Sequence, residues 1–237
     1  RDAMSRLSGD GAGMGTAQTA NTAGQDALRD LAAQVVEQAV RAGASAAEAL
    51  MGSGSEMSVR VREGRPELVH EAKSKNLGLR VFKDHRTSLT YTSDFSPDGL
   101  RTFIENAVAL CRLAEPDPLN ELPAREDLVA PDAVLPSLSL WDERTPEVDA
   151  ARAIEWARAC EAAAIAVSPK LRSGDGASYD RSIGLSAFAG GDGRGVLFAR
   201  SNRGTYQSLS VEVLADDEGG KKRNGSYWTG GRFLDQL

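Results

Sequence analysis

The chain is poor in the residue types from which metal sites and nucleophilic sites are usually built. Its 237 residues include two cysteines and two histidines. So few cysteines give neither a disulfide framework nor a paired-cysteine metal knuckle, and this favours a reducing cytoplasm. The sequence also has no apolar run near the roughly 20 residues that a membrane-spanning helix needs, so we expect no membrane contact.

The chain also has fewer basic residues than acidic ones. The formal net charge is −6, which argues against a broad affinity for nucleic acid or anionic lipid. Hydrophobic residues make up 41% of the chain and charged residues 26%, as in ordinary soluble proteins. We therefore expect a soluble cytoplasmic protein, long enough for two domains, with no direct nucleic-acid contact.

The first half of the sequence predicts one α+β unit behind a disordered leader. Residues 1–24 are rich in Gly, Ala, Ser and Thr and have no apolar core, which is typical of a disordered segment and not of a secretion signal. Apolar residues then repeat at helical spacing over 26–45. Four short strands are expected at 56–65, 67–74, 77–82 and 87–93, and a second helix is expected to begin at Ser96-Pro97.

The second half repeats this arrangement after a proline-rich linker at 123–144. Thr145 and Pro146 predict the start of a helix, and its buried stripe is expected to comprise Trp156, Ala159, Cys160, Ala163, Ala164 and Val167. Short strands are expected at 179–189, 196–202, 205–215 and 226–231. The predicted fold is α+β with two units, 25–122 and 145–237, in each of which a long helix packs on an antiparallel or mixed β-meander.

The pair His70-Glu71 looks like the start of the helix that binds zinc in metalloproteases. Such a helix needs a second histidine one turn later, but Ser74 and Lys75 stand there. The surrounding pattern is that of a strand, in which neighbouring side chains point to opposite faces. We therefore interpret His70 and Glu71 as surface residues of a strand. The remaining histidine, His85, does not complete a specific metal or catalytic site with them.

The other candidates for chemistry favour structural roles. Cys111 and Cys160 fall on apolar helical stripes and are interpreted as small core residues rather than nucleophiles. The glycine-rich runs at 9–15 and 190–195 do not match a phosphate loop, and the second is expected to form a hairpin turn. The basic triplet at 221–223 is expected in a solvated turn, and no serine lies in a nucleophile elbow. The residues alone predict no catalytic, cofactor-binding or metal-binding residue.

Several short motifs occur in an order and spacing that resemble the N-terminal and central domains of the TldD/PmbA family. They are "SVRVREGRPE" at 58–67, "LGLRVF" at 77–82, "TSDFSPDGL" at 92–100, "AEPDP" at 114–118 and the stretch that begins "LFARSNRGTYQ" at 197. The resemblance covers residues 25–237. Within the family, "AEPDP" and "LPSLSLWDERTP" at 135–146 are more similar to the PmbA branch, also called TldE, than to the TldD branch.

The resemblance implies a component of a cytosolic metalloprotease system, in a family also known as modulators of DNA gyrase. TldD-branch proteins carry their zinc motif in a later C-terminal domain that residues 1–237 do not include. PmbA-branch proteins share the fold, lack that motif and serve as the partner in a heterodimer. No catalytic residue is carried over to this chain, and zinc is expected only in a TldD-like partner.

The resemblance also implies that the assembly processes unfolded peptides, and strand edges of this chain are expected to help hold them by β-addition. The partner is either a TldD-like subunit or a second copy. Two alternatives stay open at this point. The chain could be a non-enzymatic modulator of a target such as gyrase or a toxin–antitoxin system, or a truncated, inactive relative.

Overall fold

The computed structural model describes residues 14–130 and 133–237. Its helices are α1 (Met14–Arg41), α2 (Pro97–Cys111) and α3 (Ala150–Ala166), with single 3₁₀ turns η1 (Arg125–Asp127), η2 (Thr145–Glu147), η3 (Glu218–Gly220) and η4 (Leu234–Gln236). Its strands are β1 (Ala46–Arg62), β2 (Arg65–Lys83), β3 (Arg86–Thr92), β4 (Leu171–Asp192), β5 (Gly195–Asp216) and β6 (Lys222–Gly231). The predicted α+β class is confirmed.

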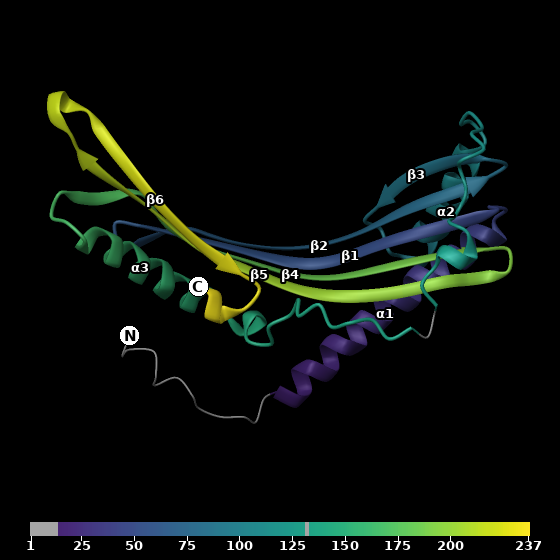
Figure 1. The fold of residues 1–237 in the computed structure, drawn as a ribbon, viewed down its shortest axis with the longest axis horizontal. Helices are drawn as coiled ribbons and strands as arrows, with labels where there is room; N and C mark the ends of the chain where they lie inside the picture. The colour runs from purple at the N-terminus through teal and green to yellow at the C-terminus, as the bar shows by residue number, and fades with distance from the viewer. Residues whose placement is uncertain (1–13, 131–132) are drawn as a thin grey trace.

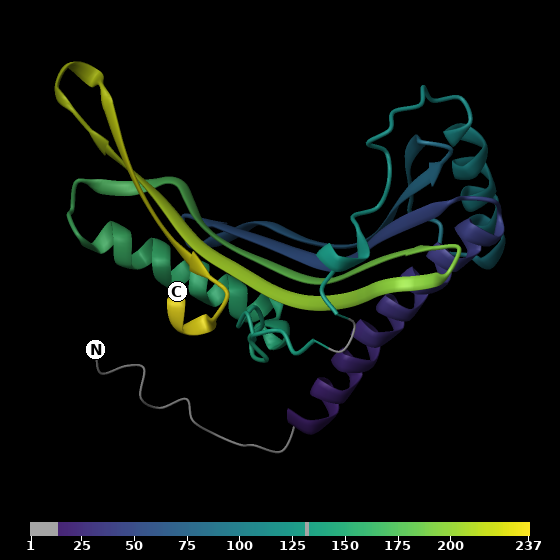
Figure 2. The same ribbon diagram turned by 45° about the vertical axis from the view of Figure 1, so that its right-hand side comes forward.

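The six strands form one antiparallel sheet in the order β3-β2-β1-β4-β5-β6. The sheet is long and curved, with α1 and α3 both on its convex side, the lower side in Figure 1. The view in Figure 2 shows the same curvature, and there too α1 and α3 lie beneath the sheet. The concave side carries no helix in the described part of the chain.

The pairing of β1 with β4 joins the two predicted units. Ala46–Val61 of β1 pairs with residues 177–192 of β4 without a shift in register. The units expected at 25–122 and 145–237 therefore share one sheet instead of each forming its own, although their boundaries stay a prediction. The segment expected as a linker, 123–144, connects elements that lie at opposite ends of this sheet.

The expected short strands were wrong in length. The segments 67–74 and 77–82 belong to one strand, β2, and the segments 196–202 and 205–215 belong to β5. The glycines that break the sequence pattern are accommodated inside the sheet. A Cβ on Gly54, for example, would lie 2.7 Å from the Ile183 carbonyl oxygen, so glycine permits close approach of the two backbones.

Two helix starts with the same sequence signature differ in the structure. Ser96 caps α2 as predicted, because its Oγ accepts a hydrogen bond from the Gly99 amide at 3.2 Å. Thr145 and Pro146 instead lie in η2, and α3 begins later with Asp149, whose carboxylate accepts from the Arg152 amide at 2.8 Å. The predicted start of this helix was therefore wrong.

The buried stripe of α3 is also rotated from the prediction. Ala153, Ala157 and Glu161 are buried, whereas Ala159, Ala163 and Val167 are exposed, and Trp156, Cys160 and Ala164 lie between these extremes. A polar interaction explains this rotation. Glu161 Oε1 and Oε2 accept hydrogen bonds from the backbone amides of Glu63 and Gly64, each at 2.8 Å, in the turn between β1 and β2. The helical spacing of apolar residues cannot identify a buried carboxylate that binds a turn.

Helix α1 begins inside the segment expected to be a disordered leader. Residues 14–24 are helical, so that prediction was wrong for this part, and residues 1–13 lie outside the described residues. The helical period read from 26–45 is correct, since Ala32, Val35, Val36 and Ala39 are buried. None of the described helices combines the length and the apolar character needed to cross a bilayer.

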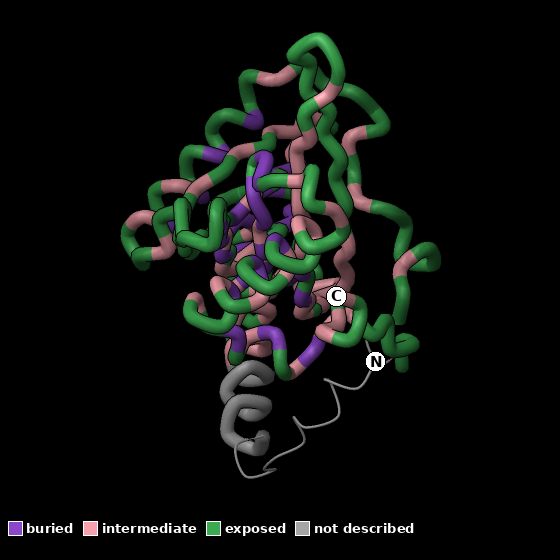
Figure 3. Tube along the Cα trace, turned by 90° about the vertical axis from the view of Figure 1, so that its left-hand side faces the viewer, coloured by how far each residue is buried: buried purple, intermediate pink, exposed green. Residues whose placement is uncertain are grey.

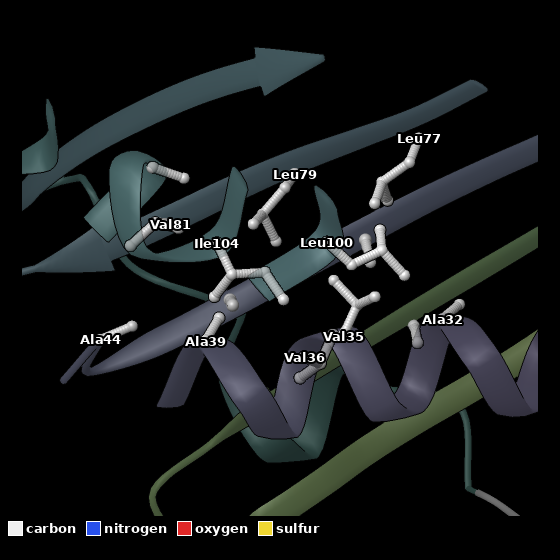
Figure 4. Close-up of a cluster of buried hydrophobic side chains, with 14 of the residues drawn as sticks. Ala32, Val35, Val36, Ala39, Ala44, Leu77, Leu79, Val81, Leu100 and Ile104 are labelled. Carbon is white, nitrogen blue, oxygen red and sulfur yellow. The ribbon is translucent and has the colours of Figure 1, made fainter. Parts of the chain in front are cut away.

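Two hydrophobic clusters lie between the convex side of the sheet and the helices. One joins α1 and α2 to the strands and includes Val35, Leu77, Leu79 and Ile104 (Figure 4). The other joins α3 to the strands and includes Val59, Ala157 and Tyr179. Figure 3 shows that the buried stretches lie inside the molecule and that the outer loops and strand ends are exposed.

The segment before η2 runs along the outer edge of β5. The Thr205 amide donates to the Leu140 carbonyl oxygen at 2.9 Å, and the Arg200 guanidinium donates to the Ala130 carbonyl oxygen at 2.9 Å. The buried Asp142 fixes this segment to the C-terminal turn, because Oδ2 accepts from the Leu234 amide at 2.8 Å. This edge of the sheet is therefore covered by the chain itself.

Replacing Gly176 with alanine is expected to destabilise the fold. Gly176 has φ +83° and lies at a register shift of β4, and a Cβ there would lie 2.0 Å from the Val61 carbonyl oxygen. We expect the free energy of unfolding in urea to fall by about 2 kcal/mol. Gly184→Ala in the same strand is the matched control, since a Cβ there meets nothing within 4 Å. Equal stability of the two variants would contradict this account.

Asp142→Asn is expected to flatten the acid side of the stability profile. Burial raises the pKa of Asp142, but hydrogen bonds from the Arg144 guanidinium and the Leu234 amide outweigh it and hold the pKa below its ordinary value. A lowered pKa in the folded state stabilises the protein above the unfolded pKa, near 4, and this contribution is lost as the pH falls through the folded value. The variant should be less stable at neutral pH and lose less stability on acidification. Asp127→Asn, at an exposed aspartate, should keep the wild-type slope.

Candidate functional site

The side of the sheet that faces away from α1, α2 and α3 is called the open face here. Strand alternation defines it: Ala49 and Met51 of β1 are buried against the helices, so Leu50 between them points the other way. Leu50 is 56% exposed. The same parity continues across the sheet through the strand registers, so each residue opposite Leu50 also lies on the open face.

A transverse row of apolar residues crosses the open face at the α1 end of the sheet. Leu50 pairs with Phe188 of β4 on one side and with Gly78 of β2 on the other, and Gly78 pairs with Tyr91 of β3. Phe188 is 41% exposed and Tyr91 is 72% exposed. Leu89, two residues before Tyr91, points the same way and is also exposed. These exposed side chains form one apolar surface and are not scattered singly.

Glycines make room for two of the rings on this surface. A Cβ on Gly78 would lie 3.1 Å from Tyr91 Cε1, and a Cβ on Gly190 would lie 2.2 Å from Phe198 Cζ. Tyr91 and Phe198 therefore lie flat over neighbouring backbone. Phe198 also contacts Phe188, with ring centroids 5.1 Å apart and an interplanar angle of 47°, a geometry that aromatic pairs favour.

An ion pair stands beside this apolar row. Arg80 Nε donates to Glu48 Oε2 at 2.7 Å, and Arg80 also lies over the Phe82 ring at 5.2 Å. The Glu48 side chain is 8% exposed and that of Arg80 is 49% exposed. The carboxylate is thus nearly withdrawn from water, and Arg80 supplies its countercharge.

The middle of the open face is flat because its residues are small. Gly52 and Gly54 of β1, Gly184 of β4 and Gly204 of β5 follow one another across the strands, with serines beside them. Beyond this floor, Tyr206 and Trp228 are exposed at 41% and 57%. The Asn76 side chain lies over Gly52, whereas the space over Gly184 is free within 4 Å. Such a surface admits the backbone of an extended chain at Gly184 and offers aromatic contacts at either end.

Part of β2 is also open at its edge. Strand β3 pairs only with residues 77–83 of β2, and no described strand pairs with the outer side of residues 65–76, which are called the β2 edge below. Every residue of the β2 edge is exposed. Unpaired backbone donors and acceptors of this kind are a template for another strand.

The residues that resemble a zinc site lie on this edge. His70 and Glu71 are in strand β2, as predicted, and are exposed. His85 lies in the β2–β3 turn with φ +58°, about 40 Å away along the strand. In the described ranges, no three His, Cys, Asp or Glu side chains gather in a group that could hold a metal ion.

The cysteines and the glycine-rich run at 190–195 take the structural positions expected of them, whereas the basic triplet does not. Cys111 is fully buried and Cys160 is half-buried, and burial raises the pKa of both thiols. The run 190–195 forms the β4–β5 hairpin turn. The basic triplet was expected in a turn, but Lys222 and Arg223 begin strand β6, where the Arg223 guanidinium pairs with Asp217 at 2.7 Å and Lys222 pairs with Asp216. This partial neutralisation leaves no broad basic patch at the triplet.

Sequence reasoning missed the open face. Leu50 and Phe188 are apolar residues in strands and look like core residues until the register shows which side they occupy. The pairing of Gly78 with Tyr91 could have been suspected from the glycine between Leu77 and Leu79, since a strand glycine often marks close approach of another group.

Comparison with known proteins defines the class to which this sheet and its helices belong. A family model described as PmbA/TldA metallopeptidase domain 1 matches residues 47–111. Metalloprotease PmbA of Escherichia coli O157:H7 is 30% identical over 191 residues, which cover 81% of this chain and 40% of that protein. The chain is therefore related to metallopeptidases.

Two solved structures share the fold. A Bacteroides thetaiotaomicron protein described as a candidate modulator of DNA gyrase matches with a TM-score of 0.75 and 21% identity, over 90% of this chain and 46% of that one. TldE from Thermococcus kodakarensis matches with a TM-score of 0.65 and 12% identity, over 86% of this chain and 43% of that one. The chain belongs to the PmbA/TldD family and is PmbA/TldE-like. It spans less than half the length of each of these proteins.

Replacing Arg80 tests how much the ion pair between Arg80 and Glu48 contributes to the stability of the fold. Arg80→Met leaves the nearly buried Glu48 carboxylate without a countercharge, and we expect the free energy of unfolding to fall by about 2 kcal/mol. The double variant Arg80→Met with Glu48→Met should recover most of that loss. Denaturant unfolding of the variants measures the difference. If the single and double variants were equally stable, the unpaired Glu48 carboxylate would not be the cause of the lost stability, and this account of the ion pair would be wrong.

Proposed function

We propose that the chain is the non-catalytic, PmbA-like component of a cytoplasmic metalloprotease assembly that processes unfolded peptides, and that its open face holds the peptide. The observation that carries this proposal is the open face itself, with exposed aromatic residues at both ends of a glycine-serine floor in a chain of this family. A zinc-bearing, TldD-like subunit supplies the cleavage.

The dimensions and chemistry of the open face suit an extended peptide. A strand advances about 3.3 Å per residue, so the long strands of this sheet can accompany many residues of an unfolded segment. Leu50, Tyr91 and Phe188 present apolar side chains that can contact the apolar residues which an unfolded segment exposes and a folded surface mostly hides. Because Gly184 carries no side chain and no other atom lies within 4 Å of its Cβ position, the peptide backbone can approach the sheet closely there.

The chain's own residues favour a binding role over catalysis. The thiols have raised pKa values through burial, and the thiolate is the reactive form of cysteine. His70 and His85 lie too far apart to act together. The proposal therefore assigns zinc to a partner subunit, and this chain positions the substrate and completes the chamber around it.

A second candidate function is a non-enzymatic modulator of a macromolecular target. It is favoured by the relative from Bacteroides thetaiotaomicron, whose name refers to DNA gyrase. With a net charge of −6, this chain would contact the protein part of such a target and not its DNA. Affinity capture with the full chain separates the two functions. A zinc-bearing, TldD-like subunit supports the first, and a topoisomerase or a toxin–antitoxin component supports the second.

Reconstitution with a TldD-like subunit tests the proposed function. The mixture should cleave an unfolded peptide, whereas the chain alone should neither cleave it nor bind stoichiometric zinc. The double variant Tyr91→Ser with Phe188→Ser should raise KM about tenfold with little change in kcat, since it removes contacts made with the peptide before and during reaction. Phe188 is 41% exposed and packs on Phe198, so some stability should be lost, and KM is compared at a temperature where the variant is still folded.

The matched control for this experiment is Val167→Ser. Val167 is an exposed apolar residue, 79% exposed, but it lies at the end of α3 on the convex side. It should leave KM unchanged. Cleavage and stoichiometric zinc binding by the isolated chain would contradict the proposal, and so would an equal effect of the convex-side and open-face variants.

A further inference from the structure

A shallow hollow of about 240 Å³ lies on the open face where β4, β5 and the end of β6 meet. Its floor contains the cross-strand pair Gly184 and Gly204, and the pair Ser182 and Tyr206 flanks this floor. One wall is the side chain of Arg232, the residue that follows β6. The space lined by these residues is called the Gly204 hollow here.

The Arg232 guanidinium lies over the glycine floor of the hollow. Its Nη1 is 3.4 Å from the position that a Cβ on Gly204 would take. The Arg232 backbone is anchored, because the buried Thr205 hydroxyl donates to the Arg232 carbonyl oxygen at 2.9 Å. The amide of the next residue, Phe233, donates to Gln236 Oε1 at 3.0 Å. These bonds fix the backbone from which the guanidinium extends over Gly204.

Arg232 differs from the other arginines of this region in having no acceptor for its guanidinium. Within residues 14–130 and 133–237, it forms no ion pair and no side-chain hydrogen bond. The other arginines between the start of β4 and the end of β6 all bond a carboxylate or a backbone carbonyl oxygen, and they are Arg172, Arg181, Arg194, Arg200, Arg203 and Arg223. The donors of Arg232 are therefore available to a ligand.

The other groups that line the hollow also suit an anion. Ser182 and Tyr206 bring hydroxyl groups from β4 and β5, and no described Asp or Glu lines the hollow. Glu56 pairs with Ser182 from β1, on the side away from Arg232. Asp180, two residues before Ser182, already accepts a hydrogen bond from a serine hydroxyl of β1 at 2.6 Å. The hollow is thus a local site of positive charge and hydroxyl donors.

We infer that the Gly204 hollow binds a carboxylate of the peptide through the Arg232 guanidinium and the hydroxyls of Ser182 and Tyr206. The planar fork of an arginine matches the two oxygens of a carboxylate. A peptide carries this group on its Asp and Glu side chains and at its C-terminus. The inference rests on the proposed function, since it requires a peptide on the open face, and it names the class of peptide that this face selects.

The strand register gives the spacing between this carboxylate and the apolar part of the peptide. Gly184 lies in the floor of the hollow, and Phe188 of the apolar row lies four residues further along β4. Four residues of a strand span about 13 Å, and alternation places the first and fifth side chains on the same side. A peptide extended along β4 therefore presents a carboxylate to Arg232 when an apolar side chain four residues away contacts Phe188.

Fluorescence anisotropy with the full chain and three unstructured peptides tests the inference. The first peptide has a glutamate four residues before and four residues after a phenylalanine and an amidated C-terminus. The second has glutamine at both places, and the third has glutamine before the phenylalanine and ends four residues after it with a free carboxylate. The first or the third, or both, should bind about fivefold more tightly than the second. The net charge of −6 repels anionic peptides in general, so this preference requires a local site.

Substitution of Arg232 tests which residue makes the site. Arg232→Gln should abolish the preference for a carboxylate and leave the affinity for the glutamine peptide unchanged, which also shows that the variant is folded. Arg232→Lys keeps the charge without the fork and should retain part of the preference. Arg112→Gln is the matched control, because Arg112 is an exposed arginine at the C-terminal end of α2, away from the open face. It should keep the full preference.

The pattern of binding also identifies the source of the carboxylate. Tighter binding of the first peptide alone assigns it to acidic side chains, and tighter binding of the third alone assigns it to the C-terminus. Equal affinity for all three peptides overturns the inference and leaves peptide binding by the open face standing, and so does a preference that survives Arg232→Gln or is lost equally in Arg112→Gln. If none of the three peptides binds, the proposed function fails together with the inference.

Discussion

The pairing of β1 with β4 is the interaction on which the rest of the structure depends. It extends over Ala46–Val61 without a shift in register, so it fixes which residues of the two halves share a side of the sheet. Met51 and Ala187 fall on the convex side with α1, and Val59 and Tyr179 fall on the same side with α3. All three helices therefore cover one side, and the other side is left open except beside Ala46 and Phe82, which are buried and share a pocket with residues 120–125.

This one-sided arrangement explains why apolar residues are exposed where they are. Leu50 and Phe188 are neighbours across β1 and β4 with the same parity, opposite to the buried set. They cannot be buried by the described helices without breaking the alternation that buries Met51 and Ala187. The exposed row is thus a consequence of the register. The proposed peptide-binding role gives a reason why these exposed residues are apolar.

Local chemistry in the sequence was enough to predict many elements but not their extent. The alternation of Met57, Val59 and Val61 and the Ser96 cap predicted a strand and a helix that the structure contains. Gly54 and Gly184 look like breaks in a sequence, yet the sheet continues through them, because the neighbouring strands supply the packing that the glycines lack.

The site was less predictable than the fold, since it depends on contacts between distant residues. Thr145-Pro146 carries the same signature as Ser96-Pro97, but burial of Thr145 in η2 and capping by Asp149 move the helix start. Glu161 binds a turn formed by Glu63 and Gly64, far away in sequence. The strongest functional signal in the sequence was the resemblance of its motifs to a known family, and this identified the family. The open face could be located only from the register of the strand pairs in the structure.

The most direct test of the account is photo-crosslinking of an unfolded peptide that carries a photoreactive group, in the presence of a TldD-like subunit. The account predicts adducts on open-face residues, among them Tyr91, Phe188 and Trp228, mapped by mass spectrometry. Adducts confined to the convex side, on the exposed flank of α3 around Val167, would contradict it.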